Sequence, residues 1–157
     1  MTALGVTGHQ NIPLAAREYV VAGIRDCVGA QPAPLIGYSS LAAGADQLFA
    51  REVLAAGGQL IAIIPSQGYE GAFAEDGLRS YQDLLASCTE TVTLDFTEPS
   101  EEAFMAAGEE VMRRSDVVIA VWDGLPAAGL GGTADAVEYA RGLGKTVVVV
   151  WPEGVRR

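Results

Sequence analysis

The sequence predicts an α/β fold, a three-layer sandwich in which a mostly parallel sheet of about six strands carries helices on both faces. Apolar, β-branched runs alternate with stretches of helical periodicity six times along the 157 residues. Most of these runs lack polar alternation, and strands buried on both faces are typical of parallel sheets. Half of the residues are hydrophobic and 19% are charged, which suits a globular protein. We therefore expect residues 1–157 to form one domain.

Turn and capping residues separate the expected elements. The first strand ends before Gly8, and Pro13 suits the first turn of the helix that follows. Gly57 and Gly58 end the second helix, and Ser100 is placed to cap the fourth. The expected strands cover residues 3–7, 35–38, 60–64, 91–94, 117–122 and 146–151.

Helical spacing also indicates which side chains face the core. The first helix is expected to bury Leu14, Val21, Ile24 and Val28, and the fourth to bury Phe104, Gly108, Val111 and Met112.

Three loops of small residues follow the first, second and fifth strands, at Gly8, Ser40 and Gly131. Right-handed crossovers between parallel strands place all such loops at one edge of the sheet. Ligands of open α/β sheets bind beyond this edge, where the strand order reverses. We therefore expect these three loops to face one crevice.

Gly131, Gly132 and Thr133 lie between an apolar strand and a helix. Helix N-termini present unpaired N–H groups and the positive end of the macrodipole, and glycine allows close approach. The pattern predicts a phosphate-binding loop. The alternative is a tight turn with Thr133 as the helix N-cap.

The other two loops supply further candidate ligand-binding residues. Ser39, Ser40 and Gly44 are expected to line the same ligand, together with Gly8 and His9. The single histidine, His9, suits either acid–base chemistry or a hydrogen bond within its loop, and we favour the loop hydrogen bond.

Three more charged residues are candidates. Asp46 stands in the first turn of its helix, and we interpret it as a cap rather than a ribose contact. Asp123 follows the fifth strand, where a carboxylate can accept hydrogen bonds from a ribose or a base. Arg79 is a candidate phosphate cation or a solvated helix residue.

Charge and composition limit the partners. The net charge of −10 argues against nucleic acid and anionic membranes, which attract clustered Lys and Arg. Cys27 and Cys88 show no metal-ligand spacing, so we expect no metal, no cofactor and free thiols. No apolar run is long enough to span a bilayer. We expect a cytoplasmic protein.

Two common nucleotide-binding motifs are missing. The first loop reads GVTGHQN instead of GxGxxG, and the second strand ends at Tyr38-Ser39 without an acidic residue for a ribose. The single lysine, Lys145, lies outside the candidate loops, which excludes a P-loop.

The sequence instead resembles a different group of proteins. Residues 39–66, SSLAAGADQLFAREVLAAGGQLIAIIPS, resemble the DNA-processing protein A family, in which Ser-Gly-Leu-Ala-x-Gly-Ile-Asp precedes a helix and a strand. Residues 122–150 resemble the glycine-rich second half of the same SLOG superfamily, including the "lonely guy" (LOG) enzymes with their Pro-Gly-Gly-x-Gly-Thr-x-x-Glu motif. Residues 5–9, GVTGH, are similar to small stand-alone members. The resemblance implies a Rossmann-like fold that binds a nucleotide, and the LOG enzymes imply a homodimer.

The sequence departs from these motifs at two positions. Ala136 stands where the LOG motif has the glutamate that the resemblance assigns to catalysis; Asp135 and Glu138 flank it. Gln10 stands where small members often carry an arginine.

Three functions follow. The first is binding of a nucleotide or related phosphorylated ribose compound through the glycine-rich loops. The second is LOG-type phosphoribohydrolase activity, the hydrolysis of an N-glycosidic bond in a nucleoside monophosphate, with Asp123, Asp135 or Glu138 as the catalytic carboxylate. The third is a regulatory or interaction module without catalysis.

Overall fold

The computed structural model describes residues 2–126 and 132–156. The strands are β1 (Thr2–Gly8), β2 (Leu35–Ser39), β3 (Gln59–Ile64), β4 (Glu90–Thr93), β5 (Val117–Val121) and β6 (Thr146–Val149). The helices are α1 (Leu14–Gly29), α2 (Ala45–Ala55), the 3-10 helix η1 (Tyr69–Ala72), α3 (Glu75–Ala86), α4 (Glu101–Arg114) and α5 (Thr133–Gly142).

The strands form one parallel sheet in the order β4-β3-β2-β1-β5-β6. The chain runs outward from β1 to β4 and then returns to place β5 on the other side of β1. The strand order therefore reverses between β1 and β5, which is where ligands bind in this class of fold. The predicted α/β sandwich is confirmed, and every strand pairing is parallel.

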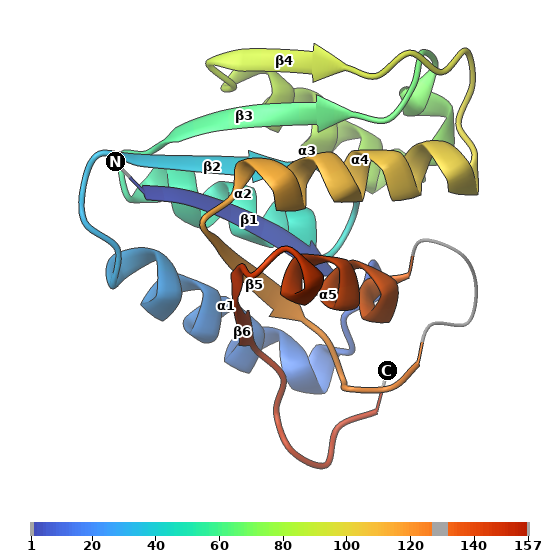
Figure 1. Cartoon of the computed structure of the whole chain (residues 1–157). Coiled ribbons are helices and arrows are strands. Elements are labelled where there is room, and N and C mark those ends of the chain that lie inside the picture. The colour runs from blue at the N-terminus through green and yellow to red at the C-terminus, as the bar shows by residue number, and fades with distance from the viewer. Residues whose placement is uncertain (1, 127–131, 157) are drawn as a thin grey trace.

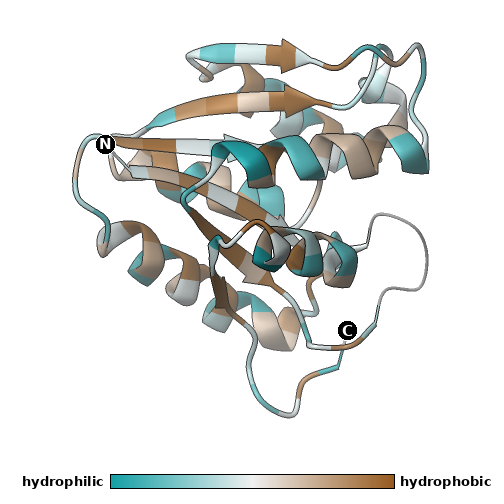
Figure 2. Ribbon diagram, viewed as in Figure 1, coloured by the Kyte–Doolittle hydropathy of each residue, from teal (hydrophilic) through white to brown (hydrophobic). Residues whose placement is uncertain are grey.

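Helices cover both faces of the sheet (Figure 1). On one face, α1 and α2 pack on β1 and β5, with Val20, Ile24 and Phe49 fully buried; α3 extends this layer over β3. On the other face, α4 and α5 pack on β3 and β5. Hydrophobic residues concentrate on the strands, and the helices mix both kinds (Figure 2).

The helix faces differ from the sequence prediction most clearly at Leu14 and Gly108, and Val21 and Phe104 are only partly buried. Leu14 is 88% exposed, because α1 begins there and buries Ala16 instead, one turn before Val20. In α4 the buried residues are Ala103, Ala107, Val111 and Met112. Gly108 is half-buried and lines a cavity described below.

Along residues 2–126 and 132–156, the longest apolar helical stretch falls short of what a bilayer crossing requires.

Candidate functional site

The site begins where β1 and β5 end side by side. Their register pairs Gly8 with Val121, and the His9 N–H continues the ladder by donating to the Val121 carbonyl at 3.1 Å. The next residues, His9 and Asp123, are thereby brought together at the carboxyl edge of the sheet. A Cβ at Gly8 would come within 2.4 Å of the Ala45 Cβ, so only glycine fits between the strand end and α2.

The buried His9 ring joins three segments. The Asp123 N–H donates to Nε2 at 3.1 Å, the Asp123 Oδ1 lies 3.3 Å from Nε2, and the Thr133 Oγ1 lies 3.3 Å from Nδ1. Trp151 packs edge-on against the ring at 5.3 Å. Because Nε2 accepts from a backbone amide, the neutral ring carries its proton on Nδ1 and donates it to Thr133. The ring thus fixes the β5 loop and the start of α5 relative to β1.

The loop between β2 and α2 is held by its own polar side chains. The Ser39 Oγ accepts from the Leu41 N–H at 3.0 Å and donates to the Asp46 carbonyl at 3.3 Å. The buried Gln47 amide donates to the carbonyls of Leu41 and Gly77, both at 3.1 Å. The loop is therefore anchored from within and from α3.

Two residues of this loop adopt positive φ. Gly44 has φ +84°, and a Cβ there would stand 2.2 Å from the Gln10 carbonyl oxygen, so the β1 loop packs directly on its backbone. Leu41, which is fully buried, has φ +58°. This conformation is rare for a bulky side chain, and strained residues of this kind concentrate at ligand-binding sites.

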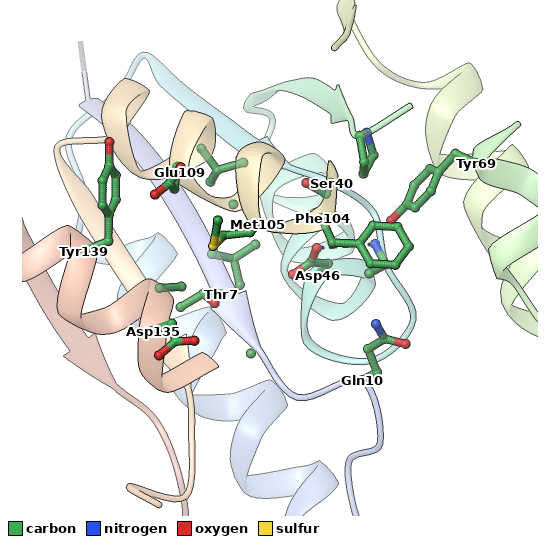
Figure 3. A pocket seen from close by; sticks show the side chains of 17 residues that line it. Thr7, Gln10, Ser40, Asp46, Tyr69, Phe104, Met105, Glu109, Asp135 and Tyr139 are labelled. Atoms are coloured by element: carbon green, nitrogen blue, oxygen red, sulfur yellow. Dashed lines mark hydrogen bonds between the residues drawn. The ribbon is translucent and has the colours of Figure 1, made fainter. Parts of the chain in front are cut away.

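A cavity of about 160 Å³ opens above the ends of β1, β2 and β3, between α4 and α5 (Figure 3). A single water needs only about 10–15 Å³ of such space, so this main cavity has room for a small organic group. Its lining is Val6, Thr7, Gly8, Gln10, Ser40, Ala42, Asp46, Pro65, Tyr69, Phe104, Met105, Gly108, Glu109, Val111, Asp135, Ala136 and Tyr139.

A second hollow, larger at about 350 Å³, adjoins the main cavity at the start of α5. It is lined by Thr7, Gly8, His9, Gln10, Asn11, Gly132 and Thr133, and so shares three residues with the main cavity. Gly132 is the N-cap of α5, and among the residues that the structure describes no side chain caps this helix. Its N-terminal N–H groups are therefore available to an anion in this hollow.

The main cavity is acidic. Asp46, Glu109 and Asp135 are its charged residues, and within residues 2–126 and 132–156 no Lys, Arg or His side chain lines it. Burial raises the pKa of the Asp46 carboxyl from 3.8 to about 7. The Ala42 N–H, which donates to Oδ2 at 3.3 Å, has the smaller and opposite effect of lowering this pKa. Burial, together with the nearby Asp46 charge, also raises the pKa of Tyr69, which stays a neutral phenol.

Most of the residues predicted from the sequence meet at this edge. Ser40, Asp46 and Asp135 line the main cavity, Thr133 and His9 line the hollow, and Gly8 lines both. Ser39 and Gly44 support the loop instead, and Asp123 holds His9 and accepts the Leu125 N–H.

Some predicted residues lie elsewhere. Arg79 is 70% exposed on α3 and pairs with Glu75 and Asp76, and Glu138 is exposed on α5; neither lines the cavity. Gly131 lies outside the described residues.

The two predicted helix caps differ from the structure. No side chain caps α2, and Asp46 instead accepts a hydrogen bond from the loop before the helix. Thr133 is the first residue of α5 rather than its N-cap, and its hydroxyl contacts His9.

One wall of the cavity, formed by α4 and η1, was not predicted from the sequence. Met105, Gly108 and Glu109 come from α4, and Tyr69 comes from η1. The signal for Gly108 was present, since a glycine inside a helix costs stability and usually has a packing or functional reason.

The fold is shared with several solved structures. DNA processing protein A from Helicobacter pylori superposes with a TM-score of 0.69 and 18% identity, over 94% of this chain and 64% of that one. The Streptococcus pneumoniae DNA processing protein A gives 0.68 and 20%, over 95% and 50%. The Moco carrier protein from Chlamydomonas rheinhardtii gives 0.54 and 16%, over 94% and 74%. The chain shares the Rossmann-like α/β fold of these proteins. It spans 64% and 50% of the lengths of the two DNA processing proteins.

In sequence alone, no family model and no curated protein matches this chain.

The comparison corrects one prediction. Net charge argued against nucleic acid as a partner, yet the Helicobacter pylori protein, which has this fold, binds single-stranded DNA. Net charge describes the whole molecule, whereas a strand of nucleic acid contacts a local surface, so a total of −10 does not exclude such a partner.

Proposed function

We propose that this protein binds a nucleotide or a related phosphorylated ribose compound at the carboxyl edge of its sheet. The observation that carries the proposal is the junction of two spaces at the strand reversal. The hollow at the uncapped N-terminus of α5 suits a phosphate, and the main cavity next to it has room for the rest of the ligand. Thr7, Gly8 and Gln10 border both spaces, so one ligand can occupy both.

The phosphate would be held by backbone amides at the start of α5 rather than by a cation. Gly132 has φ −72° and ψ 173°, which places its successor at the first helical position, and Thr133 is fixed by His9. The N-terminal N–H groups of a helix supply both hydrogen bonds and a positive potential to an anion. Ser40 lies on the side of the main cavity formed by the strained loop.

Gly132→Asp tests this proposal. The variant is expected to lose binding of adenosine 5′-monophosphate by more than about 100-fold in calorimetry, because the carboxylate enters the phosphate volume. Folding should be kept, since Asp is a favoured N-cap residue and the backbone angles suit any L-residue. Gly132→Asn, equal in shape but neutral, is the matched control and should bind more tightly than the Asp variant. Unchanged affinity in Gly132→Asp removes the proposal.

Mass spectrometry of small molecules released from freshly purified, denatured protein identifies a ligand that co-purifies. A fluorescent single-stranded DNA oligonucleotide belongs in the same binding series, since a related fold binds single-stranded DNA.

LOG-type hydrolysis is the second candidate function. It is favoured by the position of Asp135, whose carboxylate lines the main cavity one residue before the motif position. Glu138 is exposed and outside the cavity, and the Asp123 Oδ1 is engaged with His9 and Leu125. Release of free base from a nucleoside monophosphate would separate this function from binding alone, and failure to bind any phosphate compound would favour the interaction module.

We also infer a cytoplasmic homodimer. Cys27 and Cys88 are free thiols, which are usual in a reducing compartment. The dimer rests on the resemblance to the LOG enzymes.

A further inference from the structure

The walls of the main cavity restrict what part of a ligand it can hold. Three carboxyl groups reach it from three different elements, Asp46 from α2, Glu109 from α4 and Asp135 from α5 (Figure 3). Arg113 and Arg114, on the same helix as Glu109, both pair with Glu110, at 2.6 and 2.7 Å. An anionic group in this cavity would therefore meet only negative charge, whereas a hydrogen-bond donor would meet acceptors.

These acceptors are not used within the described part of the protein. Glu109 and Asp135 make no hydrogen bond or ion pair there, and the Asp46 carboxyl makes a single one, from the Ala42 N–H to Oδ2. The second oxygen, Oδ1, is left for the cavity. Asp135 is exposed and Glu109 is half-buried, so water can reach both, whereas the Asp46 carboxyl is buried. A buried titratable carboxyl in a cleft is typical of a ligand site.

The remaining lining suits a flat ring. Phe104 packs 6.1 Å from Tyr69 on one side, and Met105 adds a polarisable thioether. Gly108 leaves open space, since a Cβ built on it meets no atom within 4 Å outside its own helix turn. A glycine in mid-helix costs about 0.5–1 kcal/mol relative to alanine, so this opening is kept at the expense of stability.

We propose that the main cavity binds the base of the nucleotide and selects one with an exocyclic amino group, through a hydrogen bond to Asp46. This inference rests on the proposed function, because it takes the phosphate to lie at the N-terminus of α5. Glu109 and Asp135 add a negative potential that excludes bases carrying a carboxylate. The ligand class is thus a nucleoside 5′-monophosphate with an amino-bearing base.

Two nucleotides of nearly equal size test the selection. Cytidine 5′-monophosphate has an amino group where uridine 5′-monophosphate has a carbonyl oxygen. At pH 8, where the Asp46 carboxyl is mostly ionised, calorimetry is expected to show at least about tenfold tighter binding of the cytidine compound. Orotidine 5′-monophosphate, whose base carries a carboxylate, is expected to bind more weakly than both.

Asp46→Asn is the decisive variant. The amide oxygen keeps the hydrogen bond from Ala42, so the NH₂ group replaces the Oδ1 acceptor and becomes a donor to the cavity. The preference for the cytidine compound should fall to parity or invert. Glu138→Gln removes a carboxylate that is exposed on α5 and outside the cavity, and it should leave the preference unchanged.

The outcomes separate this inference from the proposed function. Equal binding of the cytidine and uridine compounds, or a preference that survives Asp46→Asn, overturns the inference. The proposed function still stands in that case if Gly132→Asp abolishes the binding of both compounds. If Asp46→Asn weakens both compounds equally, Asp46 binds the ribose and the inference is wrong. Absence of binding by all three nucleotides overturns both.

Discussion

At the scale of single residues, Asp46 combines a structural cost with a position in the main cavity. Its pKa is raised from 3.8 to about 7 by burial, so the folded protein holds this proton more tightly than the unfolded chain does. The free energy of unfolding contributed by this group is therefore highest at low pH and falls as the pH rises from about 4 to 7. The slope is at most about 1.4 kcal/mol per pH unit.

Asp46→Asn should remove this penalty. The variant is expected to resemble the natural protein in stability at pH 3, below the ordinary pKa of the carboxyl, and to exceed it at pH 8, because Asn carries no charge to bury and keeps the bond from Ala42. Urea unfolding at both pH values measures the difference. Asp83→Asn is the control, because the Asp83 carboxyl is exposed on α3 and its removal relieves no buried charge. Equal stability of the Asp46 variant and the natural protein at pH 8 would contradict the raised pKa.

Residue patterns predicted some of this site and not the rest. Ser40 and Asp46 follow β2 in a loop of small residues, and Thr133 opens α5 after a glycine, so their place at the carboxyl edge follows from right-handed connections alone. The direction of a helical side chain is different. Glu109 lines the cavity and its neighbour Glu110 pairs with arginines only because of how α4 packs against the sheet and α5. No local pattern contains that packing.

At the scale of elements, α4 contains a glycine that its own packing does not require. Gly108→Ala should raise the free energy of unfolding by about 0.5–1 kcal/mol, since helix propensity improves and the new methyl group meets no atom. Thermal unfolding followed by circular dichroism measures this gain. A destabilised variant would show that the space beside Gly108 is smaller than the structure has it.

A larger side chain at the same position should act on the ligand. Gly108→Leu projects into the main cavity and is expected to weaken binding of cytidine 5′-monophosphate, while Gly71→Leu, at a glycine of η1 with equally open surroundings that is not part of the lining, serves as its control.

Helix α5 carries position 136, at which the LOG motif has its glutamate. Ala136 lines the main cavity, so Ala136→Glu places a carboxylate there, as in the LOG motif. Asp135 is turned by about 100° around the helix and is one methylene shorter. A positioned acid–base group is worth about 10²–10⁴-fold in rate. We therefore expect slow or undetectable release of base from adenosine monophosphate by the natural protein and faster release by the variant.

Chromatography of the products measures this release. Robust hydrolysis by the natural protein that is lost in Asp135→Asn would make the enzyme the better interpretation.

At the scale of the whole molecule, the strand order explains why the candidate site residues lie together at one edge of the sheet. The strand patterns predicted a mostly parallel sheet of about six strands. The return of the chain from β4 to β5 reverses the strand order at β1, where the loops that follow β1 and β5 leave the sheet in opposite directions. The length of each apolar run and its lack of polar alternation were sufficient to predict these strands and their parallel arrangement. The order of the strands could not be predicted from these patterns, because it depends on which crossovers pass over β1.

The oligomeric state is the remaining prediction at this scale. Helices with alanine-rich surfaces can pack closely against a second copy. In α4 the structure buries Ala103 and Ala107, which leaves Ala106 half-buried at the surface. Light scattering is expected to give about twice the chain mass of 16.3 kDa at micromolar concentration. Ala106→Arg should shift it to the chain mass, because a long charged side chain cannot be accommodated in a close helix contact.

An interface on α4 would also border the ligand site, since Phe104, Met105 and Glu109 of the same helix line the main cavity. Dissociation should then weaken the binding of cytidine 5′-monophosphate, and the ligand should in turn strengthen the dimer by the same factor. Glu138→Gln, exposed on α5, is the control that keeps both properties. A mass of 16.3 kDa for the natural protein would contradict the dimer. A dimer whose ligand affinity is unchanged by Ala106→Arg would place its interface away from α4.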